Sequence, residues 1–195
     1  MFTVFFPENR FGLFVSGGFD SALMLYLYAI EAKKRKINQL HCITIDRGSA
    51  AIEFGQAVCD WVHTKVEIQI DQLVVAIPEG LHHSRHVSYP AEQLFRFGFN
   101  TLISADTQNP PITLDGTEPV RIPPDANYKG WHFPFAKMDK SETVKLAADL
   151  GVLDEISKIS HSCTETTGAR CGNCWQCNER QWAFKQTGLT DLGNY

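Results

Sequence analysis

A short loop between an apolar run and a helical segment constrains the fold of this chain more than any other feature. Residues 11–15 are apolar, Ser16-Gly17-Gly18 follows, and residues 20–36 contain good helix formers without proline or glycine. This order predicts a buried strand, a tight loop and a helix. The glycines bring bare N–H groups close to a ligand, and Ser16 and Ser21 add hydroxyl groups. Because the positive end of the helix dipole points at the same place, we expect the loop to bind a phosphate group.

The loop lacks the lysine of the common ATPase and GTPase phosphate loop. It instead resembles the SGGxDS pattern of pyrophosphatase-type loops, whose enzymes split ATP into AMP and pyrophosphate. In this interpretation Asp20 helps to hold the Mg²⁺ that bridges the phosphates. The alternative is an ordinary glycine turn in which Asp20 caps the helix. The predicted ATP-binding residues are Ser16, Gly17, Gly18, Phe19, Asp20 and Ser21.

The rest of the first half alternates between strand-like and helix-like segments. We expect strands at residues 2–6, 12–15, 40–45, 66–70 and 100–105, and helices at residues 20–36, 50–63 and 91–99. A strand, helix, strand unit of this spacing implies a parallel sheet with a right-handed crossover. Ligands of such sheets lie at the carboxyl ends of the strands. Asp106 follows a strand in this way, as a ligand contact or as the cap of the next turn.

Two irregular stretches leave their roles open. Residues 71–90 contain His82, His83 and His86, which either belong to a polar loop or contact a ligand or metal. Residues 107–129 contain five prolines and predict a substrate-covering loop or a mobile flap. Cys42 and Cys59, which lie in a predicted strand and a predicted helix, are interpreted as buried thiols.

A capping box at residues 139–142 predicts a helix that runs to about residue 150. Lys137 and Lys140 lie just before and at its start, where a cation is unfavourable for the helix dipole. A bound phosphate would compensate, and Lys140 is therefore a candidate catalytic residue; the alternative is a pair of solvated lysines.

Composition limits the classes of protein that remain. With 195 residues and a hydrophobic fraction of 44%, the chain is long enough for one α/β domain with a small appendage. Neither an apolar run long enough to cross a bilayer nor a signal peptide is recognised, so a cytoplasmic location is expected. The net charge is −4, and the dense basic run at residues 33–36 sits at the end of a predicted helix, where cations are favourable. We therefore expect neither membrane nor bulk nucleic acid as a partner.

Four cysteines near the C-terminus form the second strong signal. Cys163, Cys171, Cys174 and Cys177 have the spacing C-x7-C-x2-C-x2-C, which can surround one tetrahedral Zn²⁺. An iron–sulfur cluster also uses sets of four cysteines, and free thiols are a further alternative. Disulfides would need an oxidising compartment, which no other feature supports. Since all four zinc ligands would come from the protein, the ion would be structural.

The loop and the cysteines together resemble the 7-cyano-7-deazaguanine synthases (QueC proteins). That family combines Ser-Gly-Gly-x-Asp-Ser near the N-terminus with a C-terminal Cys-x(7–8)-Cys-Gly-x-Cys-x-x-Cys-x-x-Arg segment. Residues 16–21 match the first motif, and the stretch from Cys163 to Arg180 matches the second. Residues 133–135, Lys140 and residues 150–152 resemble the segment that precedes the zinc site in the family.

The resemblance implies an α/β fold of the adenine-nucleotide alpha-hydrolase-like (Rossmann-like) type, with an ATP pyrophosphatase domain at residues 1–150 and a zinc-binding lobe at residues 151–195. It also implies an ATP-dependent carbon–nitrogen ligase. Its substrates would be ATP, 7-carboxy-7-deazaguanine and ammonia, and its product 7-cyano-7-deazaguanine, with AMP and pyrophosphate released. The implied cofactors are structural Zn²⁺ and Mg²⁺. Family members are commonly homodimers, and the motifs leave the oligomeric state open.

The middle of the chain departs from the family pattern. Residues 46–49 read DRGS where a Tyr-Gly-Gln-Arg-like stretch is usual, and residues 86–90 read HVSYP where a Pro-x-Arg-Asn element is expected. Because the middle helps to form the substrate pocket, another adenylating enzyme remains as the alternative. It would be an amidotransferase or thiolase acting on a different carboxylate, base, RNA or protein terminus. A third interpretation is a non-catalytic nucleotide-binding or zinc-stapled protein.

Overall fold

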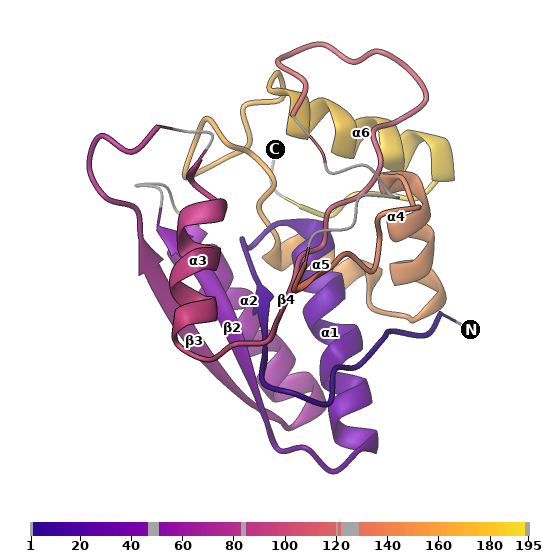
Figure 1. Cartoon of the computed structure of the whole chain (residues 1–195). Coiled ribbons are helices and arrows are strands. Elements are labelled where there is room, and N and C mark those ends of the chain that lie inside the picture. The colour runs from indigo at the N-terminus through magenta and orange to yellow at the C-terminus, as the bar shows by residue number, and fades with distance from the viewer. Residues whose placement is uncertain (1, 47–50, 83–84, 120, 122–128, 194–195) are drawn as a thin grey trace.

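The computed structural model describes residues 2–46, 51–82, 85–119, 121 and 129–193 (Figure 1). Its centre is a sheet of five parallel strands in the order β3-β2-β1-β4-β5. The strands are β1 (Phe11–Phe14), β2 (Gln39–Asp46), β3 (Gln69–Ala76), β4 (Thr101–Ile103) and β5 (Trp131–His132). The predicted α/β fold with a parallel sheet is confirmed.

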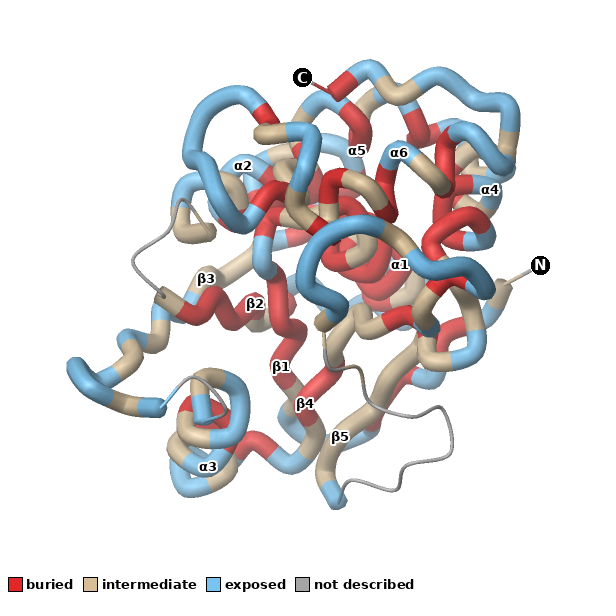
Figure 2. Tube along the Cα trace, turned by 90° about the horizontal axis from the view of Figure 1, so that it is seen from above, coloured by how far each residue is buried: buried red, intermediate tan, exposed pale blue. Residues whose placement is uncertain are grey.

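Helices cover the two faces of the sheet unequally. They are α1 (Phe19–Lys34), α2 (Ala51–Val66), α3 (Ser88–Arg96), α4 (Lys140–Asp149), α5 (Leu153–Ile159) and α6 (Trp175–Thr187). Helix α3 lies on one face and the other helices lie on the opposite side (Figure 2). Side chains alternate accordingly along β1 and the residue that follows it. Leu13 and Val15 join the larger core with α1 and α2, whereas Phe14 joins the smaller core with α3.

The N-terminal segment was wrongly predicted as a strand, because residues 2–6 pair with no strand among the described residues. Its alternating apolar side chains pack against helix α1 instead of entering the sheet. Val4 and Phe6 are buried, and the Tyr28 hydroxyl donates a hydrogen bond of 2.8 Å to the Phe5 carbonyl oxygen. In this segment the alternating apolar residues therefore indicate burial against a helix and not pairing with another strand.

The boundary between α2 and β3 also differs from the prediction. Val66 was assigned to a strand, but it ends α2, where Val58, Val62 and Val66 are buried at helical spacing. Strand β3 then runs to Ala76, through part of the stretch predicted as a loop. It lies at the edge of the sheet and is largely exposed, so its sequence is more polar than that of an interior strand.

Helix α3 begins at Ser88, three residues before the predicted start. Pro90 lies in its first turn, where a missing N–H group costs no helical hydrogen bond. The prediction at residues 139–142 is confirmed: the Asp139 carboxylate accepts from the N–H group of Glu142, whose own carboxylate accepts from the Asp139 N–H group. Helices α5 and α6 were not predicted.

Other expectations are confirmed for the described part of the chain. The basic run ends α1, where Lys33 and Arg35 form ion pairs with Glu67 and Glu31. Cys42 and Cys59 are buried. The described residues between 107 and 129 contain neither helix nor strand, whereas residues 120 and 122–128 lie outside the description, as do residues 47–49 and His83. Among the described residues, no helix is long and apolar enough to cross a membrane.

Candidate functional site

The loop after β1 lies at the carboxyl edge of the sheet and leads directly into α1. Gly17 has a φ of +79°, in the left-handed region that glycine tolerates best. Gly18 is the N-cap of α1, and its carbonyl oxygen accepts a hydrogen bond of 2.9 Å from the Ser21 hydroxyl. The Ser16 and Ser21 hydroxyl oxygens lie 3.3 Å apart. The loop thus exposes Ser16 and the amino end of α1 together.

Gly17 and Gly18 differ in what they tolerate, and this difference is testable. A Cβ atom on Gly17 would lie 2.4 Å from the Phe54 Cβ, whereas one on Gly18 would have the Ser16 hydroxyl oxygen as its nearest neighbour at 3.4 Å. We expect Gly17→Ala to lower the free energy of unfolding by at least about 2 kcal/mol through strain and overpacking. Gly18→Ala, the matched control, should change it by less than about 1 kcal/mol. Urea denaturation measures both, and equal losses would contradict the description of the loop.

Asp20, in the first turn of α1, contacts two residues of α4. One carboxylate oxygen accepts a hydrogen bond from the Lys140 ammonium, and the other accepts one of 2.8 Å from the Thr143 hydroxyl. Lys140 is 5% exposed. The structure therefore brings the two predicted catalytic residues together, although 120 positions separate them in the chain.

Two charged residues that the sequence analysis missed extend this pair. Glu179 of α6 is 1% exposed; one of its carboxylate oxygens lies 3.4 Å from the Lys140 ammonium and the other 2.5 Å from the Arg121 guanidinium. Arg121 lies 4.8 Å above the Trp175 ring and donates a hydrogen bond of 3.2 Å to the Thr107 carbonyl oxygen. Positive and negative groups thus alternate from Asp20 through Lys140 and Glu179 to Arg121.

The alternation keeps Lys140 charged. Burial by itself would lower the pKa of its ammonium group, but the carboxylates of Asp20 and Glu179 outweigh burial and raise the pKa above its ordinary value. Lys140 is therefore a fixed cation at neutral pH, in contact with Asp20 at the start of α1. Lys137, the other lysine singled out before α4, is exposed.

Phe19 contributes differently from the other loop residues. Its side chain is buried in the larger core and its ring centroid lies 5.9 Å from that of Phe184 in α6. Only its backbone N–H group can face a ligand at the amino end of α1. The Phe19 ring instead joins the loop to the C-terminal part of the chain.

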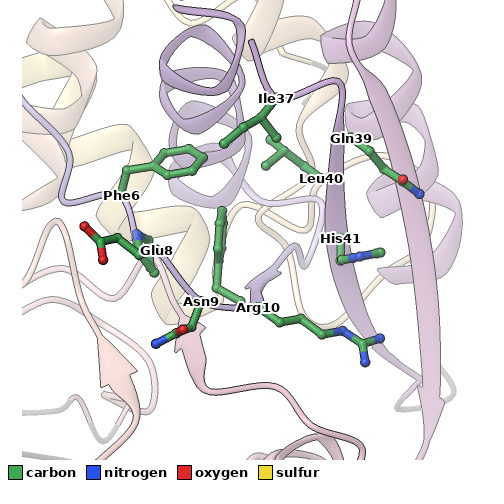
Figure 3. Close-up of a pocket in the computed structure, with 10 residues that line it drawn as sticks. Phe6, Glu8, Asn9, Arg10, Ile37, Gln39, Leu40 and His41 are labelled. Carbon is green, nitrogen blue, oxygen red and sulfur yellow. The ribbon is translucent and has the colours of Figure 1, made fainter. Parts of the chain in front are cut away.

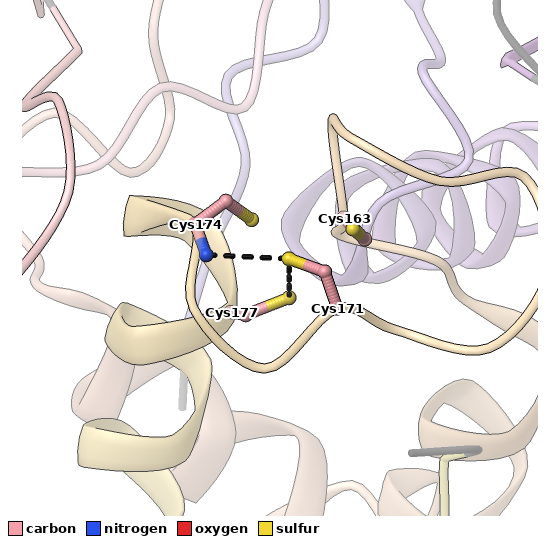
Figure 4. Close-up of side chains that lie close together, drawn as sticks. All are labelled: Cys163, Cys171, Cys174 and Cys177. Carbon is pink, nitrogen blue, oxygen red and sulfur yellow. Dashed lines mark hydrogen bonds between the residues drawn. The ribbon is translucent and has the colours of Figure 1, made fainter.

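The four predicted metal ligands converge at the start of α6 (Figure 4). Their sulfur atoms all lie within 4.8 Å of one another, and those of Cys171 and Cys177 are 3.9 Å apart. Tetrahedral zinc with bonds of about 2.3 Å separates its sulfur ligands by roughly 3.8 Å, so the arrangement fits a single metal ion. The N–H group of Cys174 donates to the Cys171 sulfur at 3.3 Å, which stabilises a thiolate. The cluster can therefore hold a metal ion.

The pKa values of the Cys163 and Cys177 thiols are shifted in opposite directions. Burial by itself would raise the pKa of the Cys163 thiol, but the neighbouring hydrogen-bonding groups, among them backbone N–H groups, outweigh burial and lower this pKa. For Cys177, burial dominates and raises the pKa of the thiol. A lowered pKa favours the thiolate of Cys163, which is the form that binds metals.

A buried ion pair supports the segment around the cysteines. Arg180 is fully buried, and its guanidinium group donates two hydrogen bonds of 2.7 Å to the Asp191 carboxylate. It also donates to the Ser160 hydroxyl at 2.9 Å and to the Ser157 carbonyl oxygen at 2.9 Å. Arg180 therefore links α5 and Asp191 to α6. In the sequence it was recognised only as part of the cysteine motif.

This ion pair predicts an acid-sensitive component of stability. Burial raises the pKa of the Asp191 carboxyl group, but Arg180 and Arg170 outweigh burial and lower it from 3.8 to about 2. Since the folded pKa is the lower one, the stabilisation is present above pH 4 and is lost as the pH falls from 4 to 2. We expect Asp191→Asn to lower the free energy of unfolding at pH 7 by about 3 kcal/mol and to reduce the loss between pH 4 and 2. Urea denaturation across this pH range, with exposed Asp149→Asn as control, tests it; parallel wild-type and Asp191→Asn profiles would contradict it.

The remaining candidates are not brought into the site by the described contacts. Asp106 follows β4 and accepts a hydrogen bond of 2.5 Å from the Ser104 hydroxyl, which leaves its predicted role untested. The His86 ring lies 3.0 Å from the Leu81 carbonyl oxygen. Among the described residues, neither His82 nor His86 belongs to a group of three or more potential metal ligands, and His83 lies outside the description.

Among the described residues, cavities are found at both ends of the strands. One of about 410 Å³ lies beyond the carboxyl ends of β2 and β3, where it is lined by Asp46, residues 76–78, Gly80, Leu81 and His86. The other, of about 260 Å³, lies at the amino ends of β1 and β2 and is lined in part by Arg10 and His41 (Figure 3). The first cavity and the Ser16–Ser21 loop both lie at the carboxyl ends of the strands, whereas the predicted site residues do not line the second cavity.

The structure thus combines a parallel sheet with the Ser16–Ser21 loop at the carboxyl ends of its strands and with helix α1 after that loop. A solved structure with the same fold is the U34-tRNA thiolase NcsA from Methanococcus maripaludis with its [4Fe-4S] cluster. It superposes with a TM-score of 0.51 at 13% identity and covers 93% of this chain and 65% of that chain. At this identity the similarity concerns the fold alone.

In sequence, the chain is similar to the QueC family. Residues 127–188 match the model of the family described as "Queuosine biosynthesis protein QueC". The 7-cyano-7-deazaguanine synthases of Gloeobacter violaceus and Methanococcus maripaludis are 36% and 39% identical over 69 and 67 residues, respectively. These matches cover 34% and 32% of this chain, and only 30% and 29% of the relatives' own lengths.

A weaker similarity extends over nearly the whole chain. The 7-cyano-7-deazaguanine synthase 1 of Sulfurisphaera tokodaii is 24% identical over 202 residues, which cover 94% of this chain and 96% of that protein. The predicted resemblance to the QueC family is therefore confirmed, and it is strongest in the part of the chain that contains the cysteine cluster.

Proposed function

We propose that this chain is an ATP-dependent carbon–nitrogen ligase that converts 7-carboxy-7-deazaguanine and ammonia into 7-cyano-7-deazaguanine. The observation that carries the proposal is the contact of Asp20 with Lys140 beside the Ser16-Gly17-Gly18 loop. A carboxylate and a permanent cation then lie next to a helix amino end that favours phosphate. The acceptor, 7-carboxy-7-deazaguanine, is inferred from the relatives, which are named 7-cyano-7-deazaguanine synthases.

In this reaction the protein must stabilise the pyrophosphate that leaves ATP. The acceptor carboxylate attacks the α-phosphorus of ATP, and the bond to pyrophosphate breaks. Ammonia then adds to the acyl adenylate and expels AMP, which leaves an amide. The amide oxygen then attacks the α-phosphorus of a second ATP, and a second pyrophosphate leaves. Loss of this oxygen with AMP and of the two nitrogen-bound protons leaves the nitrile. A carboxylate is a poor electrophile, so each activation step is needed.

The loop residues have defined tasks in these steps. Gly18 and Phe19 offer N–H groups, and Ser16 offers a hydroxyl group, to the oxygens of the pyrophosphate. The Ser21 hydroxyl donates to the Gly18 carbonyl oxygen and so stabilises the shape of the loop. Lys140 supplies a positive charge that burial and its two carboxylate neighbours hold in place. Asp20 would give a carboxylate oxygen to Mg²⁺, which supplies Lewis-acid stabilisation of the phosphates when bound.

We further propose that the cysteine cluster binds structural Zn²⁺. Its sulfur atoms are as close as the ligands of one ion, whereas an iron–sulfur cluster of several irons holds its cysteine sulfurs further apart. All four ligands are protein side chains, so no position is open for substrate. In this proposal residues 1–150 are the ATP pyrophosphatase domain, and residues 151–195 are a metal-stapled lobe that packs on α1 and α4.

A second candidate function is supported by the cavity at the carboxyl ends of β2 and β3. Asp46 and His86, which line it, come from the two segments where the sequence departs from the family pattern. If this cavity receives the acceptor, its altered lining favours another carboxylate, base or RNA terminus, activated by the same loop. The ATP chemistry is common to both candidates.

Product analysis separates the two. Purified protein loaded with zinc is incubated with Mg²⁺, ATP, ammonium and 7-carboxy-7-deazaguanine, and the acceptor is analysed by mass spectrometry. The proposal predicts the nitrile, with the amide as an intermediate. Amide without nitrile would indicate an enzyme that stops halfway. An unchanged acceptor, in a sample that binds ATP, would contradict the proposed substrate and favour the second candidate.

A further inference from the structure

One residue, His161, connects the phosphate loop with the cysteine cluster. Its backbone N–H group donates a hydrogen bond of 2.8 Å to the Gly17 carbonyl oxygen. Its ring is stacked on the Phe54 ring of α2, with centroids 4.2 Å apart and planes inclined by 6°. Phe54 is also the residue against which Gly17 packs. Gly17 is thus held between α2 and residue 161.

The hydrogen bond to Gly17 orients the neighbouring peptide group. A trans peptide is planar, with its carbonyl oxygen and N–H group pointing in opposite directions. Since the Gly17 oxygen is bound to His161, the N–H group of Gly18 must point away from His161, and its contact with the Ser16 hydroxyl oxygen is long, at 3.4 Å. Glycine on both sides would let this peptide group rotate if the bond were lost. Residue 161 therefore sets the direction of a phosphate-binding N–H group.

The imidazole ring of His161 contacts the segment between the first two cysteines. Its Nε2 lies 2.8 Å from the Thr166 carbonyl oxygen, which can only accept, so Nε2 carries the hydrogen. Thr166 in turn places its hydroxyl oxygen 3.3 Å from the Cys163 sulfur. Residues 164–169 between the first two cysteines are exposed. The Thr166 hydroxyl donates to the Ala169 carbonyl oxygen at 2.6 Å, and the Thr164 hydroxyl lies 3.2 Å from the Gln176 side-chain oxygen. A metal ion on Cys163 and Cys171 would fix both ends of this segment.

We propose that His161 is a positioning residue that couples metal binding at the cysteine cluster to ATP binding at the phosphate loop. An occupied cluster fixes residues 163–171, the bond from Thr166 then fixes the imidazole on Phe54, and the backbone of residue 161 fixes the Gly17 carbonyl. By linkage, ATP strengthens the retention of the metal by the same factor as the metal strengthens the binding of ATP. The inference rests on the proposed function in taking ATP as the nucleotide.

The test titrates metal-loaded protein with a colorimetric zinc chelator to equilibrium and measures the affinity of the protein for the metal, with and without saturating Mg²⁺ and ATP. We expect ATP to raise the metal affinity of the wild type by about 10-fold, a typical coupling factor. His161→Phe keeps a ring on Phe54 but loses the bond to Thr166, so ATP should still bind and should raise the metal affinity by less than 2-fold, about the limit of such an assay. His63→Ala removes another histidine that contacts a backbone oxygen, that of Ile68 at 2.8 Å, and should behave as the wild type.

The outcomes separate this inference from the proposed function. Calorimetric titration with Mg²⁺ and ATP first establishes binding by the metal-loaded wild type and by His161→Phe. An equal rise in metal affinity with ATP in both proteins, or binding of ATP without any rise in the wild type, would overturn the coupling alone. Absence of ATP binding by the wild type would overturn the proposed function and this inference together.

Discussion

Replacing Asp20 by asparagine is expected to reduce the ATP-dependent formation of AMP by at least about 100-fold, the usual loss when one electrostatic contact to a transition state is removed. The amide is neutral and is a poorer ligand for Mg²⁺ than a carboxylate. It also removes one of the two carboxylates that keep the buried Lys140 charged. The measurement is the initial rate of AMP release by chromatography, at saturating Mg²⁺ and ATP.

The control for Asp20→Asn is Asp60→Asn, the same change on the exposed face of α2, where the carboxylate contacts only the Gln56 side chain among the described residues. It should retain the wild-type rate. Because Asp20 also pairs with Lys140, the unfolding of both variants is followed by urea denaturation. An Asp20→Asn protein that is folded and forms AMP at the wild-type rate would contradict the role assigned to this carboxylate.

Replacing Cys171 by serine is expected to abolish tight metal binding and to lower the free energy of unfolding by several kcal/mol. A structural zinc site contributes its binding free energy to folding, and three cysteines hold the ion much less well than four. Cys171 is a sensitive position because its sulfur lies near that of Cys177 and accepts from the N–H group of Cys174. Metal content by mass spectrometry and thermal unfolding measure the two effects.

Cys59→Ser is the matched control, because Cys59 is a buried cysteine outside the cluster. It should retain about one metal ion per chain, whatever its effect on packing. The metal analysis also distinguishes zinc from iron: a brown, oxygen-sensitive protein would replace the zinc proposal by an iron–sulfur cluster. Full metal content in Cys171→Ser would contradict the four-ligand site.

The loop between β1 and α1 and the convergence of the four cysteines could be predicted because each is encoded locally. Ser16, Gly17 and Gly18 follow an apolar run directly, and the cysteines are close enough in sequence for their spacing to specify convergence. Helix α4 was recognisable for the same reason, since the Asp139 capping box is completed within one turn.

Features that depend on distant partners could not be predicted. Glu179 reads as one polar residue of a helix, and its burial beside Lys140 and Arg121 becomes apparent only once α6 packs on α4. The N-terminal strand was predicted wrongly because alternation of Val4 and Phe6 does not reveal whether a strand or a helix lies opposite. The prediction ended strand β3 too early, because an edge strand can be polar and still pair with the one strand beside it.

The identity of the nucleotide products tests the central claim most directly. Metal-loaded protein is incubated with Mg²⁺, ATP, ammonium and 7-carboxy-7-deazaguanine, and the phosphorus-containing products are resolved by ³¹P NMR. Transfer of AMP at a pyrophosphatase-type loop predicts AMP and pyrophosphate, with neither formed when the acceptor is omitted. ADP and inorganic phosphate as the products would contradict the account, because they would show cleavage at the γ-phosphate instead of the α-phosphate.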